Sequence, residues 1–214
     1  TDLLYAKPLP ISTGNSSITT NVGGLRNYGW EFDISSTNIS KPNFTWRTSL
    51  NMSFNKNEIT ELTQESFISG SKRWAVGQSL YDFFLVEWAG VDPETGMGTW
   101  WYDKTDASGN VTREKTDNYS LANVEGSKRY VGSSLPDFTG GFSNYFKVGQ
   151  FDLNALFNFS FGAQVLDSSY QSLMSGFSSE GRQQHVDVLK AWTKPGDITD
   201  VPMNVMRQNN NNGT

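Results

Sequence analysis

The sequence predicts an all-β protein, a segment of an antiparallel transmembrane β-barrel with long extracellular loops. Aromatic residues make up 14% of the chain and charged residues only 18%. Gly, Asn, Ser and Thr fill the difference, a composition that favours strands and turns over long helices. Apolar and polar residues also alternate with a period of two over segments as long as 44–55. Such a segment is long enough to cross a bilayer as a tilted strand, which takes ~9 to 11 residues.

Two alternating segments, 28–35 and 44–55, form the first predicted hairpin. Their apolar positions are Tyr28, Trp30, Phe32 and Ile34 in the first segment and Phe44, Trp46, Leu50, Met52 and Phe54 in the second. We expect a polar link over Ser36–Asn43 to join them. If the two apolar faces share one side, the period of two places Arg47 opposite either Glu31 or Asp33.

The second predicted hairpin depends on one turn. Gly149-Gln150 offers Gly at the first central position of a two-residue type II′ turn, which pairs Val148 with Phe151. Extending this register pairs Phe146 with Leu153, Asn144 with Ala155 and Phe142 with Phe157 on one face, and Lys147 with Asp152 and Tyr145 with Asn154 on the other. One turn therefore sorts both strands into an apolar and a mainly polar side, with Leu156 as the exception.

A soluble antiparallel sandwich is the alternative fold, because its strands alternate as well. Two features favour the membrane barrel. The predicted strands exceed the ~5 to 6 residues typical of soluble sheets, and aromatic residues gather near the ends of the apolar faces, as in the interfacial girdles of membrane barrels. These aromatic residues are Tyr28, Phe44, Trp46, Phe54, Phe151 and Phe161.

A long stretch, Lys56–Asp137, separates the two predicted hairpins, and a second long stretch follows the second hairpin from Gly162 to the end. Short turns on one side and long loops on the other are typical of outer-membrane barrels, whose long loops are extracellular. Within the first stretch, Ser79–Val91 and Thr99–Asp103 are predicted strands. They bracket an Asp92–Gly96 turn, and a second turn is expected over Asp103–Asn110.

Charge and composition exclude several classes. The net charge is −5 and Lys and Arg are not clustered, so nucleic acid is not an expected partner. The chain has no cysteine, which excludes disulfides and thiolate metal sites. No apolar run approaches the ~20 residues of a membrane helix. The first ten residues lack the pattern of a signal peptide, so we expect a segment of a longer exported polypeptide.

No catalytic residue or metal site is predicted. His185 is the single histidine and lies in a polar stretch without an obvious second ligand. Asp92 and Glu94 resemble a glycosidase carboxylate pair in type, but the neighbouring Pro and Gly explain them as turn residues. A glycoside hydrolase fragment is therefore only a third hypothesis. Calcium is the one cofactor that the oxygen-rich turns could hold, and neither turn matches the twelve-residue calcium loop.

Aromatic side chains in the presumed extracellular half are the candidate ligand contacts, because their faces stack on sugar rings or peptide side chains. The candidates are Trp74, Trp88, Trp100, Trp101 and Tyr102. The alternative is that these residues pack between strands of the wall.

Five segments, in order along nearly the whole chain, resemble the C-terminal barrel region of the SusC/RagA family of TonB-dependent outer-membrane transporters. They are Asn21-Val-Gly-Gly-Leu-Arg-Asn-Tyr-Gly-Trp-Glu-Phe32, Phe54-Asn-Lys-Asn-Glu-Ile59, Trp88-Ala-Gly-Val-Asp-Pro-Glu-Thr-Gly96, Leu135-Pro-Asp-Phe-Thr-Gly-Gly-Phe142 and Trp192-Thr-Lys-Pro-Gly-Asp-Ile-Thr-Asp-Val-Pro202. Each is short, and their common order makes the match specific.

The resemblance implies a 22-stranded barrel in the bacterial outer membrane, in contact with its lipid. Such a barrel imports glycans or peptides that a SusD-like surface lipoprotein captures, and TonB supplies energy through an N-terminal plug. Neither the plug nor the closing strands resemble any part of this chain. Residues 1–214 are therefore expected to lie within the barrel domain. A soluble carbohydrate-binding β-sandwich is the alternative function.

Overall fold

The computed structural model describes residues 2–175 and 181–205. The chain forms two compact units. Unit 1 comprises Thr1–Phe83 and Gly132–Val165, and unit 2 comprises Phe84–Val131 and Leu166–Thr214. None of the helices among the described residues is both long and apolar enough to cross a membrane.

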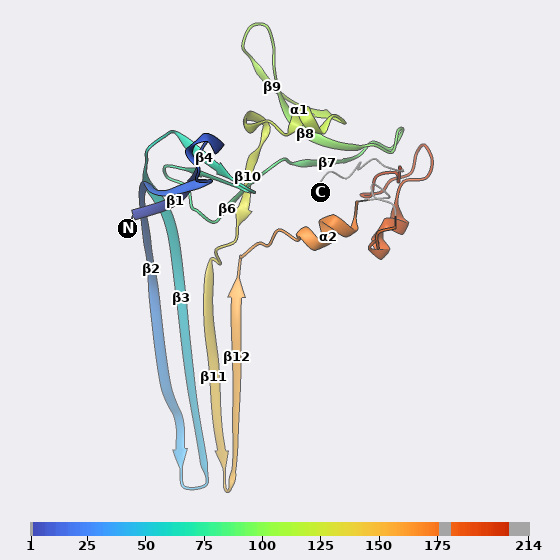
Figure 1. Cartoon of the computed structure of the whole chain (residues 1–214). Coiled ribbons are helices and arrows are strands. Elements are labelled where there is room, and N and C mark those ends of the chain that lie inside the picture. Colours follow the sequence, from blue (N-terminus) through green and yellow to red (C-terminus); the bar gives the residue numbers. More distant parts are fainter. Residues whose placement is uncertain (1, 176–180, 206–214) are drawn as a thin grey trace. The chain divides into compact units, whose positions relative to one another are not determined.

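Unit 1 is built on a five-stranded antiparallel sheet with the order β1-β2-β3-β11-β12. The strands are β1 (Asp2–Pro8), β2 (Ser17–Lys41), β3 (Phe44–Leu62), β11 (Phe138–Val148) and β12 (Phe151–Phe161), with a 3-10 turn η1 (Ile11–Thr13) between the first two. Two long hairpins, β2–β3 and β11–β12, lie side by side with their closed ends at the same end of the sheet (Figure 1).

The second hairpin has the predicted register along its whole length. Val148 is opposite Phe151, Phe146 opposite Leu153, Asn144 opposite Ala155 and Phe142 opposite Phe157. Gly149 has a φ of 61°, in the region that glycine adopts without a Cβ penalty. The two-residue turn, its closing pair and the positive φ of Gly149 are confirmed.

The first hairpin forms, but the predicted link between its strands is wrong. β2 continues to Lys41, and only Pro42 and Asn43 turn the chain before β3 begins. Residues 36–41 extend the strand although they are mostly polar, because backbone pairing with β3 needs no apolar side chain. Strand length thus exceeds what alternation alone indicates.

The predicted charge pairing of Arg47 is also wrong. Arg47 lies opposite Thr37, while Asp33 is opposite Asn51 and Glu31 opposite Ser53. The tight turn at the end of the longer strands, together with a bulge between Thr37 and Ile39, sets this register. The guanidinium of Arg47 instead lies 6.0 Å from the centre of the Tyr145 ring on β11.

The sheet of unit 1 has one apolar and one polar face, as the alternation predicts. The rows Ile34–Leu50–Phe142–Phe157 and Phe32–Met52–Gly140–Phe159 cross β2, β3, β11 and β12 on the apolar side. Much of this face is open: Trp30 is 73% exposed, Phe151 81% and Leu153 62%. A sandwich requires a second sheet packed on this face. Within the described part of unit 1 no second sheet covers it.

A second, four-stranded sheet has the order β10-β6-β5-β4. Its strands are β4 (Ser66–Ser69), β5 (Lys72–Ala75), β6 (Asp82–Leu85) and β10 (Arg129–Ser133). The single strand predicted over Ser79–Val91 is therefore wrong. Residues 79–81 form a turn, in which the Ser79 amide donates to the Asp82 carboxylate and the Tyr81 amide donates to the Ser79 hydroxyl.

Unit 2 contains a three-stranded antiparallel sheet of β7 (Trp88–Val91), β8 (Gly98–Thr105) and β9 (Val111–Thr116). The predicted Thr99–Asp103 strand and the Asp92–Gly96 turn are confirmed, whereas the next turn begins at Asp106 because β8 runs on to Thr105. The helices are short: α1 (Tyr119–Ala122), η2 (Glu125–Ser127), α2 (Ser168–Leu173) and η3 (Val186–Lys190). A small core joins Met174, Val188 and Val201.

Candidate functional site

The predicted aromatic group in unit 2 is partly a packing cluster. Trp100 on β8 is only 3% exposed. Its ring makes edge contacts with Trp88 on β7, at 5.5 Å between ring centres, and with Tyr119 on α1, at 5.2 Å. Trp100 therefore offers no accessible face to a ligand, and Tyr119 joins the cluster although the sequence did not single it out.

Trp74 lies in unit 1, apart from the other four candidates in its packing. Its ring contacts Tyr5 edge-on at 5.6 Å, and Tyr5 in turn contacts Phe67 at 5.6 Å. The indole nitrogen of Trp74 is buried without a hydrogen-bond partner. These contacts give Trp74 a packing role at β4 and β5.

Trp101 and Tyr102 follow Trp100 on β8 and are half-buried. The Lys115 ammonium lies 5.1 Å from the centre of the Trp101 ring, and its Nζ also donates to the Ala89 carbonyl at 3.0 Å. The Tyr102 hydroxyl donates to Glu114 at 3.4 Å. Both aromatic side chains thus have accessible surface beside charged groups on β9.

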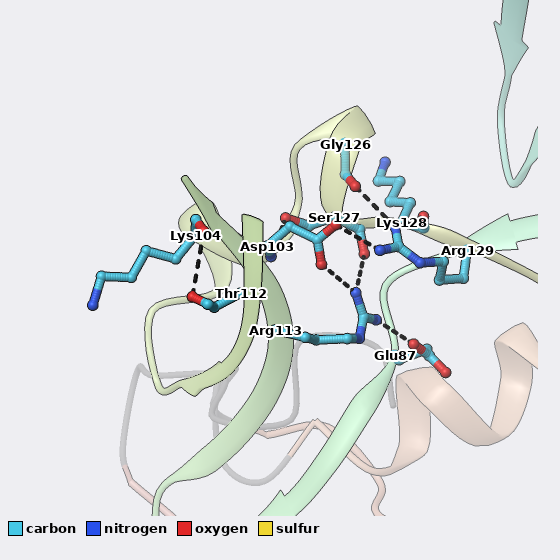
Figure 2. A network of polar contacts seen from close by, with 9 residues as sticks. All are labelled: Glu87, Asp103, Lys104, Thr112, Arg113, Gly126, Ser127, Lys128 and Arg129. Carbon is cyan, nitrogen blue, oxygen red and sulfur yellow. Dashed lines mark hydrogen bonds and ion pairs between the residues drawn. The ribbon is translucent and has the colours of Figure 1, made fainter. Parts of the chain in front are cut away.

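A charge network holds the β8–β9 hairpin to the η2 segment (Figure 2). Asp103 forms ion pairs with Arg113 at 2.6 Å and with Arg129 at 2.5 Å, and Arg113 also pairs with Glu87. The hydroxyl of the fully buried Ser127 accepts from the Asp103 amide at 3.0 Å. Hydrogen bonding from Arg129 is the largest cause that lowers the pKa of Asp103, followed by hydrogen bonding from Arg113.

This network was missed at the level of sequence, although part of its signal was available. Asp103 and Arg113 are directly opposite across the β8–β9 hairpin. A hairpin assigned around the Asp106–Asn110 turn would have placed these opposite charges together. Glu87 and Arg129 come from segments whose positions depend on tertiary packing, and no local pattern indicates them.

A hollow of about 440 Å³ lies in unit 1 and a larger one of about 510 Å³ lies in unit 2. The lining of the larger hollow consists of Val91, Asp92, Pro93, Thr95, Met97, Thr99, Lys115, Thr116 and Asp117. Its charged groups are one lysine and two aspartates. Lys115 belongs both to this hollow and to the contact with Trp101, so an accessible aromatic side chain and a charged hollow share a residue.

The remaining polar candidates have local structural partners. The Asp92 carboxylate accepts from the Glu94 amide and the Thr95 hydroxyl, both at 2.9 Å. The Glu94 hydrogen bond is the main cause that lowers the pKa of Asp92, the opposite of what a catalytic acid needs. Nδ1 of His185 accepts from the Asp187 amide at 3.2 Å and caps η3.

The described residues 2–175 and 181–205 contain no group of three or more acidic or histidine side chains placed to hold a metal ion. In the Asp106–Asn110 turn, Oδ1 of Asp106 accepts from the amides of Ser108 and Asn110, both at 2.8 Å. These carboxylate lone pairs are directed to the turn itself.

Long antiparallel strands with an open apolar face and an opposite polar face define the wall of a membrane β-barrel. No family model matches the chain. The chain is 32% identical over 223 residues to TonB-dependent receptor P3 of Formosa agariphila, across 97% of this chain and 22% of that receptor. It is 46% identical over 63 residues to TonB-dependent receptor SusC of Bacteroides thetaiotaomicron, across 29% of this chain and 6% of SusC.

Solved structures give the same result. The RagAB peptide transporter matches with a TM-score of 0.80 and 27% identity, over 97% of this chain and 23% of that chain. The chain belongs to the SusC/RagA family of TonB-dependent receptors. It spans less than a quarter of the length of these relatives, which are named as receptors and a transporter and not as enzymes.

Proposed function

We propose that this chain forms part of the barrel wall and extracellular loops of an outer-membrane importer for a glycan or peptide nutrient. The observation that carries the proposal is the open apolar face of unit 1. Trp30, Ile34 and Leu153 are each at least 60% exposed on that face, and lipid is the solvent that stabilises such a surface. The similarity to TonB-dependent receptors over 97% of the chain supports the same class.

The proposal includes the rest of the importer. Residues 1–214 belong to the barrel domain, other parts of the polypeptide supply the remaining strands of a 22-stranded barrel, and a plug domain couples it to TonB. A SusD-like lipoprotein at the cell surface delivers the nutrient. The similarity to the RagAB peptide transporter supports a two-component importer and makes peptide the first nutrient class to test.

Within unit 2, we propose that Trp101 and the hollow beside Lys115 contact the nutrient or the lipoprotein. Trp101 has accessible ring surface next to a cation, whereas Trp100 and Trp74 are occupied by packing contacts. Trp88 packs against Trp100, and Tyr102 lies on the opposite face of β8 from Trp101, where its hydroxyl donates to Glu114. Calcium has no part in this proposal.

The test uses the full-length protein in its own cell. A deletion strain is grown on defined peptides or on single glycans, and the nutrient whose use requires the protein is identified. Trp101→Ala removes a contact of ~0.5 to 1.5 kcal/mol beyond area burial, so growth on that nutrient should slow while the surface level stays normal. Leu121→Ala, at a half-exposed position of the same unit, is the matched control.

The contrary results are specific. Unchanged growth of Trp101→Ala removes this residue from the contact surface. A joint fall of surface level and growth makes Trp101 a packing residue. Absence of the full-length protein from the outer membrane, or its purification without a surface lipoprotein, contradicts the importer itself.

A further inference from the structure

One polar row interrupts the apolar face of the unit 1 sheet. It runs across the strands as Ser36 on β2, Thr48 on β3 and Asn144 on β11, and ends at Ala155 on β12. The rows on either side are apolar or aromatic: Ile34–Leu50–Phe142–Phe157 on one side and Ile39–Trp46–Phe146–Leu153 on the other. The row therefore faces the same side as the exposed apolar residues.

The polar side chains in and beside this row bond to one another across the strands. The side-chain oxygen Oδ1 of Asn144 accepts from the Trp46 indole nitrogen at 3.0 Å and from the Thr48 hydroxyl at 3.1 Å. The Thr48 hydroxyl in turn accepts from the side-chain amide of Asn38 at 2.6 Å. The Trp46 ring also stacks on Phe146 of β11, with 5.8 Å between ring centres. Both bonds to Asn144 join β3 to β11.

Depth in the bilayer makes these bonds consequential, and this step rests on the proposed function. From Phe44 to Phe54 the strand rises ~33 Å at ~3.3 Å per residue, or ~25 Å across a membrane at a tilt of ~40°, which equals the height of a barrel's apolar band. Measured in the same way from Phe44, which marks the lower edge of that band, Thr48 lies ~10 Å inside it. Lipid carbonyls and water are absent there, so only protein groups can satisfy these polar atoms.

The β3–β11 pair also needs a register signal more than its neighbours do. Two tight turns fix β2–β3 and β11–β12, but residues 63–137 separate β3 from β11. A slip of two residues keeps every side chain on its own face, and the aromatic and aliphatic rows would interchange with little loss. On this face the polar row distinguishes the registers by hydrogen bonding, because Asn144 would then face Leu50 or Trp46 in place of Thr48.

We propose that Asn144, Trp46 and Thr48 form a membrane-embedded clasp that fixes the register of β3 against β11 during barrel assembly. A slip that places Asn144 opposite Leu50 separates the Asn144 oxygen from the indole N–H and leaves both unpaired in hydrocarbon, and a slip that places it opposite Trp46 removes its bond to Thr48. Each unpaired group is strongly unfavourable there. The clasp acts as a buried Asn does at a coiled-coil interface, where a polar group selects one register at some cost in stability.

The test measures register directly in the full-length protein in cells. Thr45 and Lys147 are opposite in the native register, so the pair Thr45→Cys with Lys147→Cys reports it through a short thiol cross-linker. The pairs Thr45→Cys with Tyr145→Cys, and Ser49→Cys with Tyr145→Cys, report slips of two residues in the two directions. Heat-modifiable gel mobility in a pulse-chase experiment reports the rate of assembly.

Asn144→Leu makes the apolar face more uniform, so lipid contact alone predicts normal or better assembly. The clasp predicts the reverse: the ratio of slipped to native cross-link should rise roughly tenfold, and the folded form should appear more slowly. Trp46→Phe keeps an aromatic ring without the N–H and should show a smaller change of the same kind. Asn158→Leu, the same substitution on the polar face of β12, should leave the register native.

The clasp is overturned if Asn144→Leu gives only the native cross-link and assembles at the wild-type rate. A native register together with an altered size of the purified complex also overturns it, and identifies the row as a contact with another protein. Failure of the wild-type chain to give either the native cross-link or a heat-modifiable form contradicts the proposed barrel function itself. The two failures are therefore distinguishable.

Discussion

The long hairpins of unit 1 and the β8–β9 region of unit 2 are stabilised in different ways. In the hairpins a two-residue alternation extends over whole strands, many large apolar side chains of β2 and β12 remain exposed, and turns set the pairing. In unit 2 the strands are short and depend on particular contacts, such as the burial of Trp100 and the pairing of Asp103 with two arginines. The hairpins should therefore respond to which face a residue occupies, and unit 2 to which partner it loses.

The largest expected effect comes from Trp100→Ala in unit 2. Removing a nearly buried indole from between Trp88 and Tyr119 leaves a cavity, which destabilises the fold of unit 2 by ~3 to 5 kcal/mol. Residues 84–131 should become sensitive to protease added to intact cells, while heat-modifiable mobility shows that the barrel still forms. Trp101→Ala on the same strand is the control and should stay resistant. Equal resistance of both variants would mean that Trp100 does not hold unit 2 together.

The sequence predicted the hairpins better than unit 2 because alternation is visible in the sequence, whereas the particular contacts of unit 2 are not. Alternation together with the glycine turn at Gly149 determined every pair of β11 and β12. It failed at Arg47, because the true turn lies at Pro42 and Asn43 and a bulge shifts the pairs. The face that a residue occupies follows from the local alternation, whereas the register of a hairpin depends on where its turn and its bulges lie.

In the candidate site, residue types were easier to predict than their environments. The aromatic group of unit 2 was recognised from its sequence, but the burial of Trp100 follows from α1, whose Tyr119 covers it. Trp74 was grouped with the others because it falls in the presumed extracellular half, whereas its ring packs on Tyr5 from β1. Burial arises from elements that are remote in sequence, and a single chain without its fold does not specify it.

The next largest effect tests the faces of the hairpins. Leu50 and Asn51 are neighbours on β3 that point to opposite faces. A charge at the bilayer midplane on the lipid side is unfavourable by ~2 to 4 kcal/mol and is nearly neutral on the polar side. Leu50→Arg should reduce the heat-modifiable, folded form of the full-length protein, and Asn51→Arg should not. Equal behaviour of the two variants would reverse or abolish the face assignment.

The smallest effect concerns the ion pairs of unit 2 and depends on pH. Arg129 and Arg113 hold the pKa of Asp103 below its usual value in the folded state. A carboxylate whose folded pKa is lowered stabilises the fold above its unfolded pKa of ~3.9, and this contribution is lost as the pH falls through the folded value. Protease resistance of residues 84–131 should therefore be constant near neutral pH and decline once the pH drops below about 4.

Asp103→Asn isolates this contribution. It keeps a side chain of the same shape but removes the charge that pairs with Arg113 and Arg129, so unit 2 should lose roughly 1 kcal/mol at neutral pH, as a partly exposed ion-pair network does. Its decline in acid should be shallower than that of the wild type, because the titrating group is gone. Asp117→Asn, a carboxylate of the same unit outside the network, should keep the wild-type profile. If the Asp103→Asn and wild-type acid profiles coincide, other carboxylates govern the stability of unit 2 and the network does not distinguish it from the hairpins.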